Sequence, residues 1–201
     1  MGSEYEITAI ILAAGLSRRM GRFKPLLYTG KKTFLENLAD RFREAGVNRI
    51  LVVTGYKQAA LMPLIKELGL EYAYNPLFRE EMLWSVKCGV QALDADCQGF
   101  FIAPVDVPGV KTATLRQMLG TLEAHPGRII YPVCNGRRGH PPLIAARFRA
   151  GLLEWKGNGG LQAFLREHDE QVLELPVEDS GILIDYDTPE DLINLETRHT
   201  L

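Results

Sequence analysis

The residue types best suited to bind an anionic ligand are concentrated in one segment near the start of the chain, residues 13–25. It begins with Ala13, Ala14 and Gly15, small residues that let backbone N–H groups approach a phosphate chain. It continues with four cations, Arg18, Arg19, Arg22 and Lys24. Because these charges can balance phosphate charge, the segment predicts a polyphosphate-binding loop, although the G-x-x-x-x-G-K-[ST] pattern of a P-loop is absent.

Carboxylates that could join such a site occur farther along the chain. Asp106 follows a strongly apolar segment and stands two residues before Pro108. It is predicted to hold Mg²⁺ against phosphate oxygens, since oxygen ligands suit this ion; the alternative is that it caps the following turn. Asp185 and Asp187 alternate near the C-terminus, and alternate residues of a strand point the same way, so they are expected to face one site together.

The elements that must position these residues alternate between two patterns. Apolar segments typical of strands are residues 7–13, 49–54, 70–74, 99–103, 128–133, 171–177 and 181–184, several of them apolar on both faces. Helical patterns cover residues 33–45, 58–68, 85–93, 113–124, 161–167 and 189–197. This order predicts an α/β fold, a three-layer sandwich with a mostly parallel, Rossmann-like sheet. Ligands of such sheets bind beyond the carboxyl ends of the strands, where residues 13–25 and Asp106 fall.

Local signals mark three boundaries. Thr33 and Glu36 have the spacing of a capping box, and Thr188 precedes a proline at a helix start. Residues 136–139 read as the tip of a hairpin between two short strands.

Composition limits the kinds of partner. The chain has 201 residues, 46% hydrophobic, and a formal charge of −2, which predicts one domain, residues 1–201, and argues against a nucleic-acid or membrane-surface partner. The apolar run at residues 9–14 is far shorter than the ~20 residues that cross a bilayer. Three cysteines without C-x-x-C spacing indicate neither a disulfide framework nor a zinc site and favour the cytoplasm.

The stretch Leu12-Ala13-Ala14-Gly15-x-Ser17-x-Arg19-Met20-Gly21-x-x-Lys24 resembles the signature of the nucleotidyltransferases that make molybdenum-cofactor dinucleotides, in particular the molybdenum cofactor cytidylyltransferases. The resemblance implies that Lys24, Arg19 and Asp106 are the catalytic residues, with the two cations on the phosphates. The nucleotide-binding set that it implies is Leu12, Ala13, Ala14, Gly15, Ser17, Arg19, Gly21, Lys24, Ser85 and Asp106.

The acidic segment 185–191 resembles the D-x-D-T-P-E-D segment of the cytidylyltransferases. This similarity implies that Asp187 is a second metal ligand beside Asp106, with Asp185 next to it. Residues 75–89 resemble a loop and helix that approach the base and the ribose. There Ser85 is expected to cap the helix and to present its hydroxyl, or the amides after it, to cytosine.

Departures from the family pattern fall mostly on the acceptor side. Glu81, Leu83 and Trp84 replace a glycine and serines, and Trp84 is interpreted as core rather than as a stacking face. Residues 139–143 and 157–162 resemble segments near the acceptor, but Asn158, Leu161 and Gln162 replace Asp, Ala and Arg. Arg137 and Arg138 either substitute for the missing Arg or lie in a solvated turn.

The resemblance implies a Mg²⁺-dependent transfer of CMP from CTP to a phosphate-bearing acceptor such as molybdopterin, with release of pyrophosphate. A molybdoenzyme or its chaperone is then a further expected partner. The Ala13-Ala14-Gly15 turn resembles the cytidylyltransferase form, whereas guanylyltransferases carry Ala-Gly-Gly. The alternatives are GTP as the nucleotide, a sugar or polyol phosphate as the acceptor, or a non-catalytic protein that binds the nucleotide or escorts the cofactor.

Overall fold

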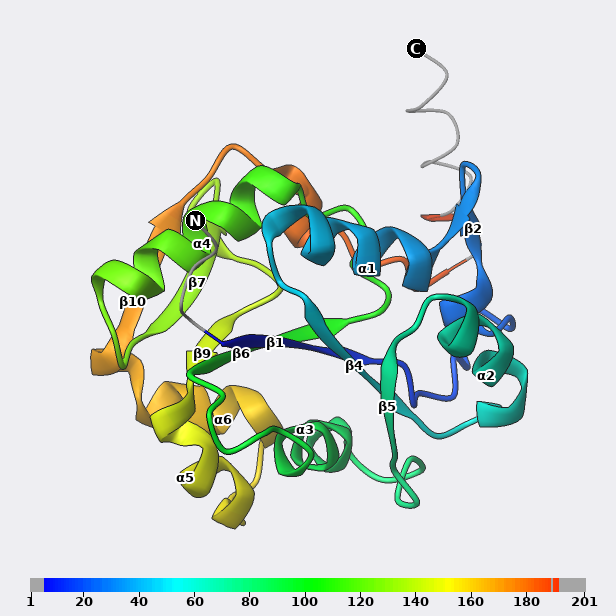
Figure 1. Cartoon of the computed structure of the whole chain (residues 1–201), viewed down its shortest axis with the longest axis horizontal. Coiled ribbons are helices and arrows are strands. Elements are labelled where there is room, and N and C mark those ends of the chain that lie inside the picture. The colour runs from blue at the N-terminus through cyan, green and yellow to red at the C-terminus, as the bar shows by residue number, and fades with distance from the viewer. Residues whose placement is uncertain (1–5, 189, 192–201) are drawn as a thin grey trace.

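The computed structural model describes residues 6–188 and 190–191, which form a central sheet with helices on both faces (Figure 1). The strands of this sheet are β1 (Ile7–Leu12), β4 (Arg49–Thr54), β5 (Glu71–Tyr74), β6 (Gly99–Pro104), β7 (Ile129–Cys134), β8 (Arg137–Arg138), β9 (Leu143–Ala145) and β10 (Val172–Pro176). Their order is β10-β7-β9-β6-β1-β4-β5, with β8 paired to β7. Since β8 and β9 pair antiparallel and the other pairs are parallel, the predicted mostly parallel sheet is confirmed.

The middle of the sheet is the core because its strands are apolar on both faces. All six residues of β1 are buried, and β1 pairs in parallel with β4 on one side and β6 on the other. Burial on both faces is what helices above and below a parallel sheet require. The carboxyl ends of β1 and β6 therefore lie side by side, with Leu12 opposite Pro104.

The helices of the described residues are α1 (Phe34–Ala45), α2 (Gln58–Glu67), α3 (Met82–Gln91), α4 (Thr112–Ala124), α5 (Arg149–Glu154) and α6 (Gly160–Glu167). Figure 1 shows α1 and α4 over one face of the sheet and α3, α5 and α6 over the other, so the three-layer prediction is confirmed. Helix α3 packs closely on β1, because a Cβ at Gly89 would lie 2.4 Å from Cγ2 of Ile10. None of the helices in the described part of the chain is long and apolar enough to cross a membrane.

The predicted capping box at the start of α1 is confirmed. Oγ1 of Thr33 accepts from the backbone N–H of Glu36 at 3.2 Å, and Oε2 of Glu36 accepts from the N–H of Thr33 at 2.7 Å. Thr33 also belongs to a short hairpin of β2 (Tyr28–Thr29) and β3 (Lys32–Thr33), which connects the loop after β1 to α1.

Two predicted elements are wrong in their local form. Residues 181–184 form no strand, since the 3₁₀ helix η4 (Ser180–Leu183) occupies this position. The hairpin tip is Asn135 and Gly136, with φ of 51° and 72°, and the two arginines that follow form β8. The cause is that a two-residue turn of this kind needs positive φ at both positions, which Asn and Gly accept. The predicted helix at 189–197 lies outside the described residues apart from 190 and 191.

The turn at η4 is organised by Asp179, which is 1% exposed. Its Oδ2 accepts from Oγ1 of Thr114 at 2.7 Å and from the backbone N–H of Lys111 at 2.8 Å, and Oδ1 accepts from the N–H of Gly181 at 3.1 Å. Gly181 packs directly on Gly109, since a Cβ at position 181 would lie 2.1 Å from the carbonyl oxygen of Gly109. These contacts fasten the segment after β10 to the start of α4.

We expect Asp179→Ala to lower the free energy of unfolding by about 2–4 kcal/mol, because it leaves the buried hydroxyl of Thr114 and the partly buried N–H of Lys111 without an acceptor. Urea denaturation followed by circular dichroism measures this change. The neighbouring, exposed Glu178→Ala is the matched control and should cost under about 0.5 kcal/mol. Equal losses in the two variants would contradict the assigned role of Asp179.

Candidate active site

A cavity of about 410 Å³ opens at the carboxyl ends of β1 and β6, where an open α/β sheet binds its ligands. The structure brings eight of the predicted site residues together in its lining: Leu12, Ala13, Ala14, Gly15, Ser17, Lys24, Ser85 and Asp106. Arg19, Gly21, Asp185 and Asp187 do not line it. The cavity is thus built by the loop after β1, the end of β6 and the start of α3.

The loop after β1 is closed by its own serine. Ser17 has φ of +50°; its carbonyl accepts from the N–H of Gly21 at 3.1 Å, and its Oγ accepts from the N–H of Lys24 at 3.2 Å. The N–H of Ala13 donates to the carbonyl of Val53 at 2.9 Å and continues the sheet. The Ala13 amide is therefore already paired within the sheet. In the described residues, the N–H groups of Ala14, Gly15 and Leu16 have no backbone partner and stay available at the cavity.

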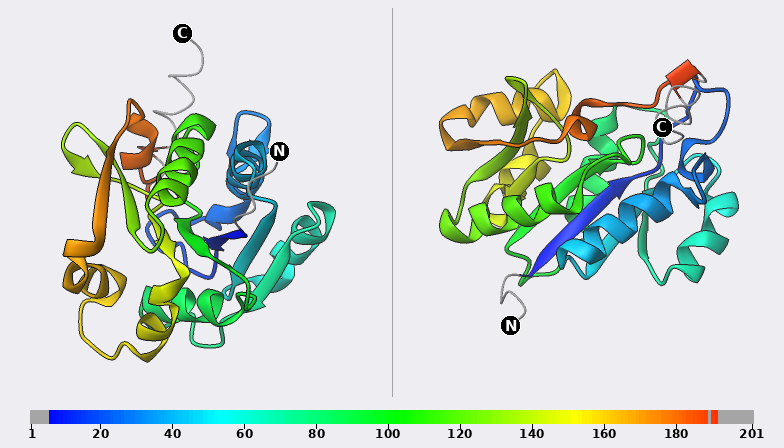
Figure 2. Two further views of the ribbon diagram at one scale, coloured as in Figure 1. Left: turned by 60° about the vertical axis from the view of Figure 1, so that its left-hand side comes forward. Right: turned by 90° about the horizontal axis from the view of Figure 1, so that it is seen from above.

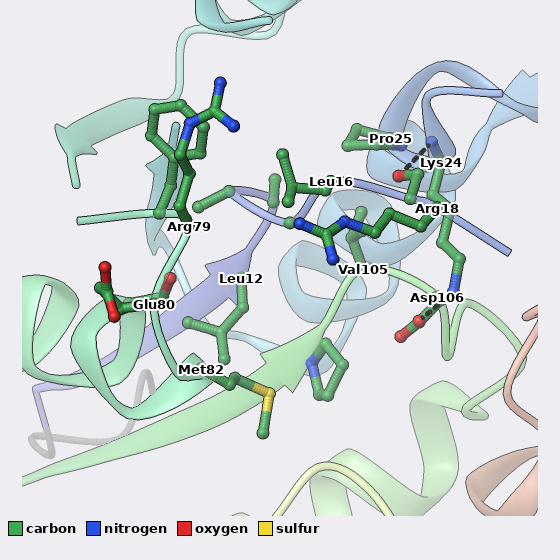
Figure 3. Close-up of a pocket in the computed structure, with 17 residues that line it drawn as sticks. Leu12, Leu16, Arg18, Lys24, Pro25, Arg79, Glu80, Met82, Val105 and Asp106 are labelled. Carbon is green, nitrogen blue, oxygen red and sulfur yellow. Dashed lines mark hydrogen bonds and ion pairs between the residues drawn. The ribbon is translucent and has the colours of Figure 1, made fainter. Parts of the chain in front are cut away.

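Lys24 connects the loop to two carboxylates from distant parts of the chain. Its Nζ lies 2.7 Å from Oδ2 of Asp106 and 2.5 Å from Oδ1 of Asp187 (Figure 3 shows the first contact). Burial on its own would lower the pKa of Lys24, but the hydrogen bonds to both aspartates and their negative charges raise it above its ordinary value. Lys24 is therefore a charged ammonium held between two carboxylates.

The C-terminal segment supplies Asp187 by crossing back over the ends of the strands, and Figure 2 (right) shows it reaching the loop after β1. Oδ2 of Asp187 lies 2.7 Å from Nη2 of Arg19, whose side chain is 74% exposed. The N–H of Tyr186 donates to the carbonyl of Asp106 at 3.0 Å, which holds the two acidic segments together. Arg19 thus braces Asp187 from outside the cavity.

Asp185 does not share the position of Asp187, because residues 184–188 form no strand and the two side chains do not alternate on a sheet. Its side chain is exposed and contacts neither Lys24 nor Arg19 in the ion pairs of the described residues. Reduced hydration raises the pKa of Asp185, and the charge of Asp106 raises it further. The expectation that Asp185 and Asp187 act together through strand alternation is wrong.

The donor atoms of Asp106 and Asp187 fit a Mg²⁺ ion. Both carboxylates converge on one point, where the ammonium of Lys24 lies, and hard oxygen ligands are what Mg²⁺ requires. Across residues 6–188 and 190–191, no group of three or more His, Cys, Asp or Glu side chains is arranged to hold a metal by itself. Phosphate oxygens of a bound nucleotide would have to complete the coordination.

Four further residues line the cavity, although no individual role was predicted for them: Arg18, Phe78, Arg79 and Met82. In Figure 3 the side chain of Arg18 extends into the cavity, whereas the guanidinium of Arg79 turns away, 5.5 Å from the ring of Phe78. Met82 and Phe78 add apolar side chains to the lining. The run of cations in residues 18–24 signalled Arg18 as well as Arg19, but spacing alone does not say which of two neighbours faces inward.

Ser85 reaches the cavity from inside α3. The helix begins at Met82 with Glu81 as N-cap, so the expectation that Ser85 caps it is wrong. Its Oγ accepts from Nδ2 of Asn75 at 3.0 Å. Trp84 is 46% exposed, which also makes its assignment to the core wrong; Nζ of Lys87 lies 5.6 Å from its ring centroid.

A second cavity, of about 590 Å³, adjoins the first and shares Met82 with it. Its lining includes Arg138, His140, Gln162 and Arg166. Arg138 lies over the ring of Tyr131 at 5.3 Å and pairs with Asp169 and Glu174, so it is anchored rather than free in solvent. Burial lowers the pKa of His140, opposed by the charges of Asp185 and Asp106. Arg137 is exposed and does not line this cavity.

Comparison with known proteins identifies the family of the chain. The MobA-like NTP transferase domain matches residues 9–172. The chain is 29% identical over 196 residues to the molybdenum cofactor cytidylyltransferase of Escherichia coli, covering 96% of this chain and 97% of that protein. It is 28% identical over 203 residues to the nicotine blue oxidoreductase of Paenarthrobacter nicotinovorans, covering 94% and 96%. A probable molybdenum cofactor guanylyltransferase of Bacillus mycoides is 28% identical over 147 residues, covering 68% and 66%.

Among solved structures, Rv0371c of Mycobacterium tuberculosis H37Rv matches with a TM-score of 0.84 and 25% identity, covering 97% of this chain and 100% of that one. The sheet with helices on both of its faces is therefore the fold of this solved structure as well. The chain belongs to the MobA-like NTP transferase family and is a nucleotidyltransferase.

Proposed function

We propose that this enzyme transfers CMP from CTP to the phosphate group of an acceptor, molybdopterin or the molybdenum cofactor, and releases pyrophosphate. The observation that carries the proposal is the convergence of Asp106 and Asp187 on Lys24 beside the cavity of about 410 Å³. Carboxylates that can share a cation, next to an ammonium that can contact phosphate, are the groups that nucleotidyl transfer requires. The Ala13-Ala14-Gly15 turn and the E. coli relative support CTP as the nucleotide.

In this mechanism, the residues of the chain mainly position charge. Mg²⁺ held by Asp106 and Asp187 would neutralise phosphate oxygens as the α-phosphorus is attacked. Lys24 leaves its carboxylate partners and binds phosphate oxygens of the nucleotide. Arg18 and the backbone N–H groups of residues 14–16 bind the remaining phosphate groups. The acceptor phosphate is already an anionic nucleophile, so the chain needs no general base; in-line alignment and charge stabilisation supply the acceleration.

The adjoining cavity of about 590 Å³ is the proposed acceptor site. It shares Met82 with the first cavity and carries Arg166 in its lining beside the paired Arg138, and such cations suit an acceptor that bears a phosphate. A molybdoenzyme or its chaperone would then receive the product.

The cysteines Cys88, Cys97 and Cys134 are free thiols, which is consistent with the proposed location in the cytoplasm.

The direct test is pyrophosphate release by the purified protein with CTP, Mg²⁺ and molybdopterin. Release that requires all three supports the proposal. Release with GTP in place of CTP would identify a guanylyltransferase, as in the Bacillus mycoides relative's name. Binding of CTP without any release would instead support a nucleotide-binding escort protein.

We further expect CTP with Mg²⁺ to raise the melting temperature more than GTP does at equal concentration, because at a given concentration the ligand with the lower Kd for the native state stabilises it more. A thermal-shift series with the four ribonucleoside triphosphates makes the comparison. ADP-ribose without Mg²⁺ serves as a control for unspecific phosphate binding. A larger shift with GTP would contradict the cytidine assignment.

A further inference from the structure

The buried side chain of Asn75 has a fixed orientation. It is 2% exposed, its Oδ1 accepts from the backbone N–H of Leu77 at 2.9 Å, and its Nδ2 donates to Oγ of Ser85 at 3.0 Å. A backbone N–H can only donate, so the amide oxygen must face Leu77 and the NH₂ group must face Ser85. The backbone N–H of Asn75 donates to the carbonyl of Thr54 at 2.8 Å and anchors the residue at the end of β5.

This arrangement sets the direction of the Ser85 hydroxyl. A serine hydroxyl has one hydrogen to donate and two lone pairs. One lone pair accepts from Asn75, and in the described part of the chain no protein acceptor is recorded for the hydrogen. Ser85 is 8% exposed and lines the cavity of about 410 Å³. Its hydrogen is therefore available to a ligand in this cavity.

The cavity has two ends of different chemistry. Arg18, Lys24 and Asp106 lie at one end, and Figure 3 shows Leu12 and Met82 away from Lys24 at the other. A triphosphate suits the end with Lys24, and a planar base suits the end with Leu12 and Met82, which Arg79 and Glu80 also line and where α3 contributes Ser85.

We infer that Asn75, by donating to Ser85, keeps the hydrogen of that hydroxyl free to donate to a nucleobase acceptor, such as the carbonyl oxygen or unprotonated ring nitrogen of cytosine. The inference rests on the proposed function, since it takes the cavity to bind a nucleotide. Asn75 does not line this cavity, so it is a positioning residue that acts through Ser85. If that hydrogen were instead donated within the protein, the acceptor atom of the base would lose its donor and be left unpaired, which lowers affinity.

Asn75→Asp is the sharpest test because it changes hydrogen-bond direction with almost no change in shape. The carboxylate introduced by this substitution, favoured in its ionised form by the Leu77 N–H, would accept from Ser85 and turn the lone pairs of that hydroxyl toward the base. We expect N75D to raise the Kd for CTP about 10-fold or more, and S85A to raise it about 5-fold, by calorimetry at pH 8 with Mg²⁺.

The decisive measurement is the double variant N75D/S85A. If Asn75 acts through the hydroxyl, N75D in the S85A background should change the Kd less than about 2-fold. The control Thr54→Val alters the packing next to Asn75 without touching Ser85, and it should leave the Kd unchanged. An equal effect of N75D with and without the hydroxyl would overturn the inference and leave Asn75 a purely structural residue.

Where N75D does not fold, as shown by circular dichroism, Asn75→Ala replaces it. N75A frees the hydroxyl to rotate and should raise the Kd about 3-fold, again only when Ser85 is present. No change in Kd for any of these variants would overturn the inference while CTP binding by the unchanged protein still stands. Absence of CTP binding by the unchanged protein, in contrast, would contradict the proposed function itself.

Discussion

Asp106→Ala is expected to lower kcat for pyrophosphate release by at least about 100-fold, because removing one carboxylate from a metal site leaves transition-state charge without its counterion. The fold should survive, since the Asp106 side chain is partly exposed and its backbone carbonyl still accepts from Tyr186. Steady-state kinetics over a Mg²⁺ titration, with circular dichroism on the same samples, measures the effect.

The matched control for this change is Asp96→Ala, an exposed aspartate at the other end of the sheet, before β6. It should retain normal kcat. Near-normal pyrophosphate release by Asp106→Ala at saturating Mg²⁺ would show that the metal is held elsewhere.

Lys24→Ala and Arg22→Ala should differ strongly although the two cations are two residues apart. Lys24 lies in the cavity between Asp106 and Asp187, whereas Arg22 is exposed. Lys24 is placed to stabilise phosphate charge as it develops, so its loss should cost roughly 3 kcal/mol, about 100-fold, and should lower kcat more than it raises KM. Arg22→Ala should cost under about 0.5 kcal/mol.

Steady-state kinetics of both variants with CTP and the acceptor tests whether Lys24 makes a specific phosphate contact. Equal losses would mean that its cations act only as a diffuse positive surface. A larger loss at Arg22 would place the phosphates on the other side of the loop from Lys24.

The central strands could be predicted because their signal is local. Residues 7–13, 49–54 and 99–103 are mostly apolar runs between helical patterns, and β1, β4 and β6 lie there within one residue of these bounds. The strand β9 has only three residues, too few for a periodicity. The turn at η4 depends on contacts with residues about 70 positions earlier in the chain: Asp179 bonds to Lys111, and Gly181 packs on Gly109. Local patterns contain no information about such contacts.

The candidate site divides in the same way. The loop after β1 and Asp106 follow strands and could be placed at one edge of the sheet from topology alone. The turn at Ser17 decides that Arg18 points into the cavity and Arg19 away from it. Helix α3 begins three residues before Ser85 because of the loop that precedes the helix. The direction of the Ser85 hydroxyl needed the partner of Asn75, which only three-dimensional contacts reveal.

The pairing of Lys24 with Asp187 joins positions 163 residues apart. A chain emerging from the ribosome is made from its N-terminus, so the loop after β1 and Asp106 exist well before Asp187 is synthesised. Until then Lys24 has one carboxylate instead of two, and a metal ion would find half of its protein ligands. An unfinished chain therefore lacks one of the two carboxylates that we propose as metal ligands.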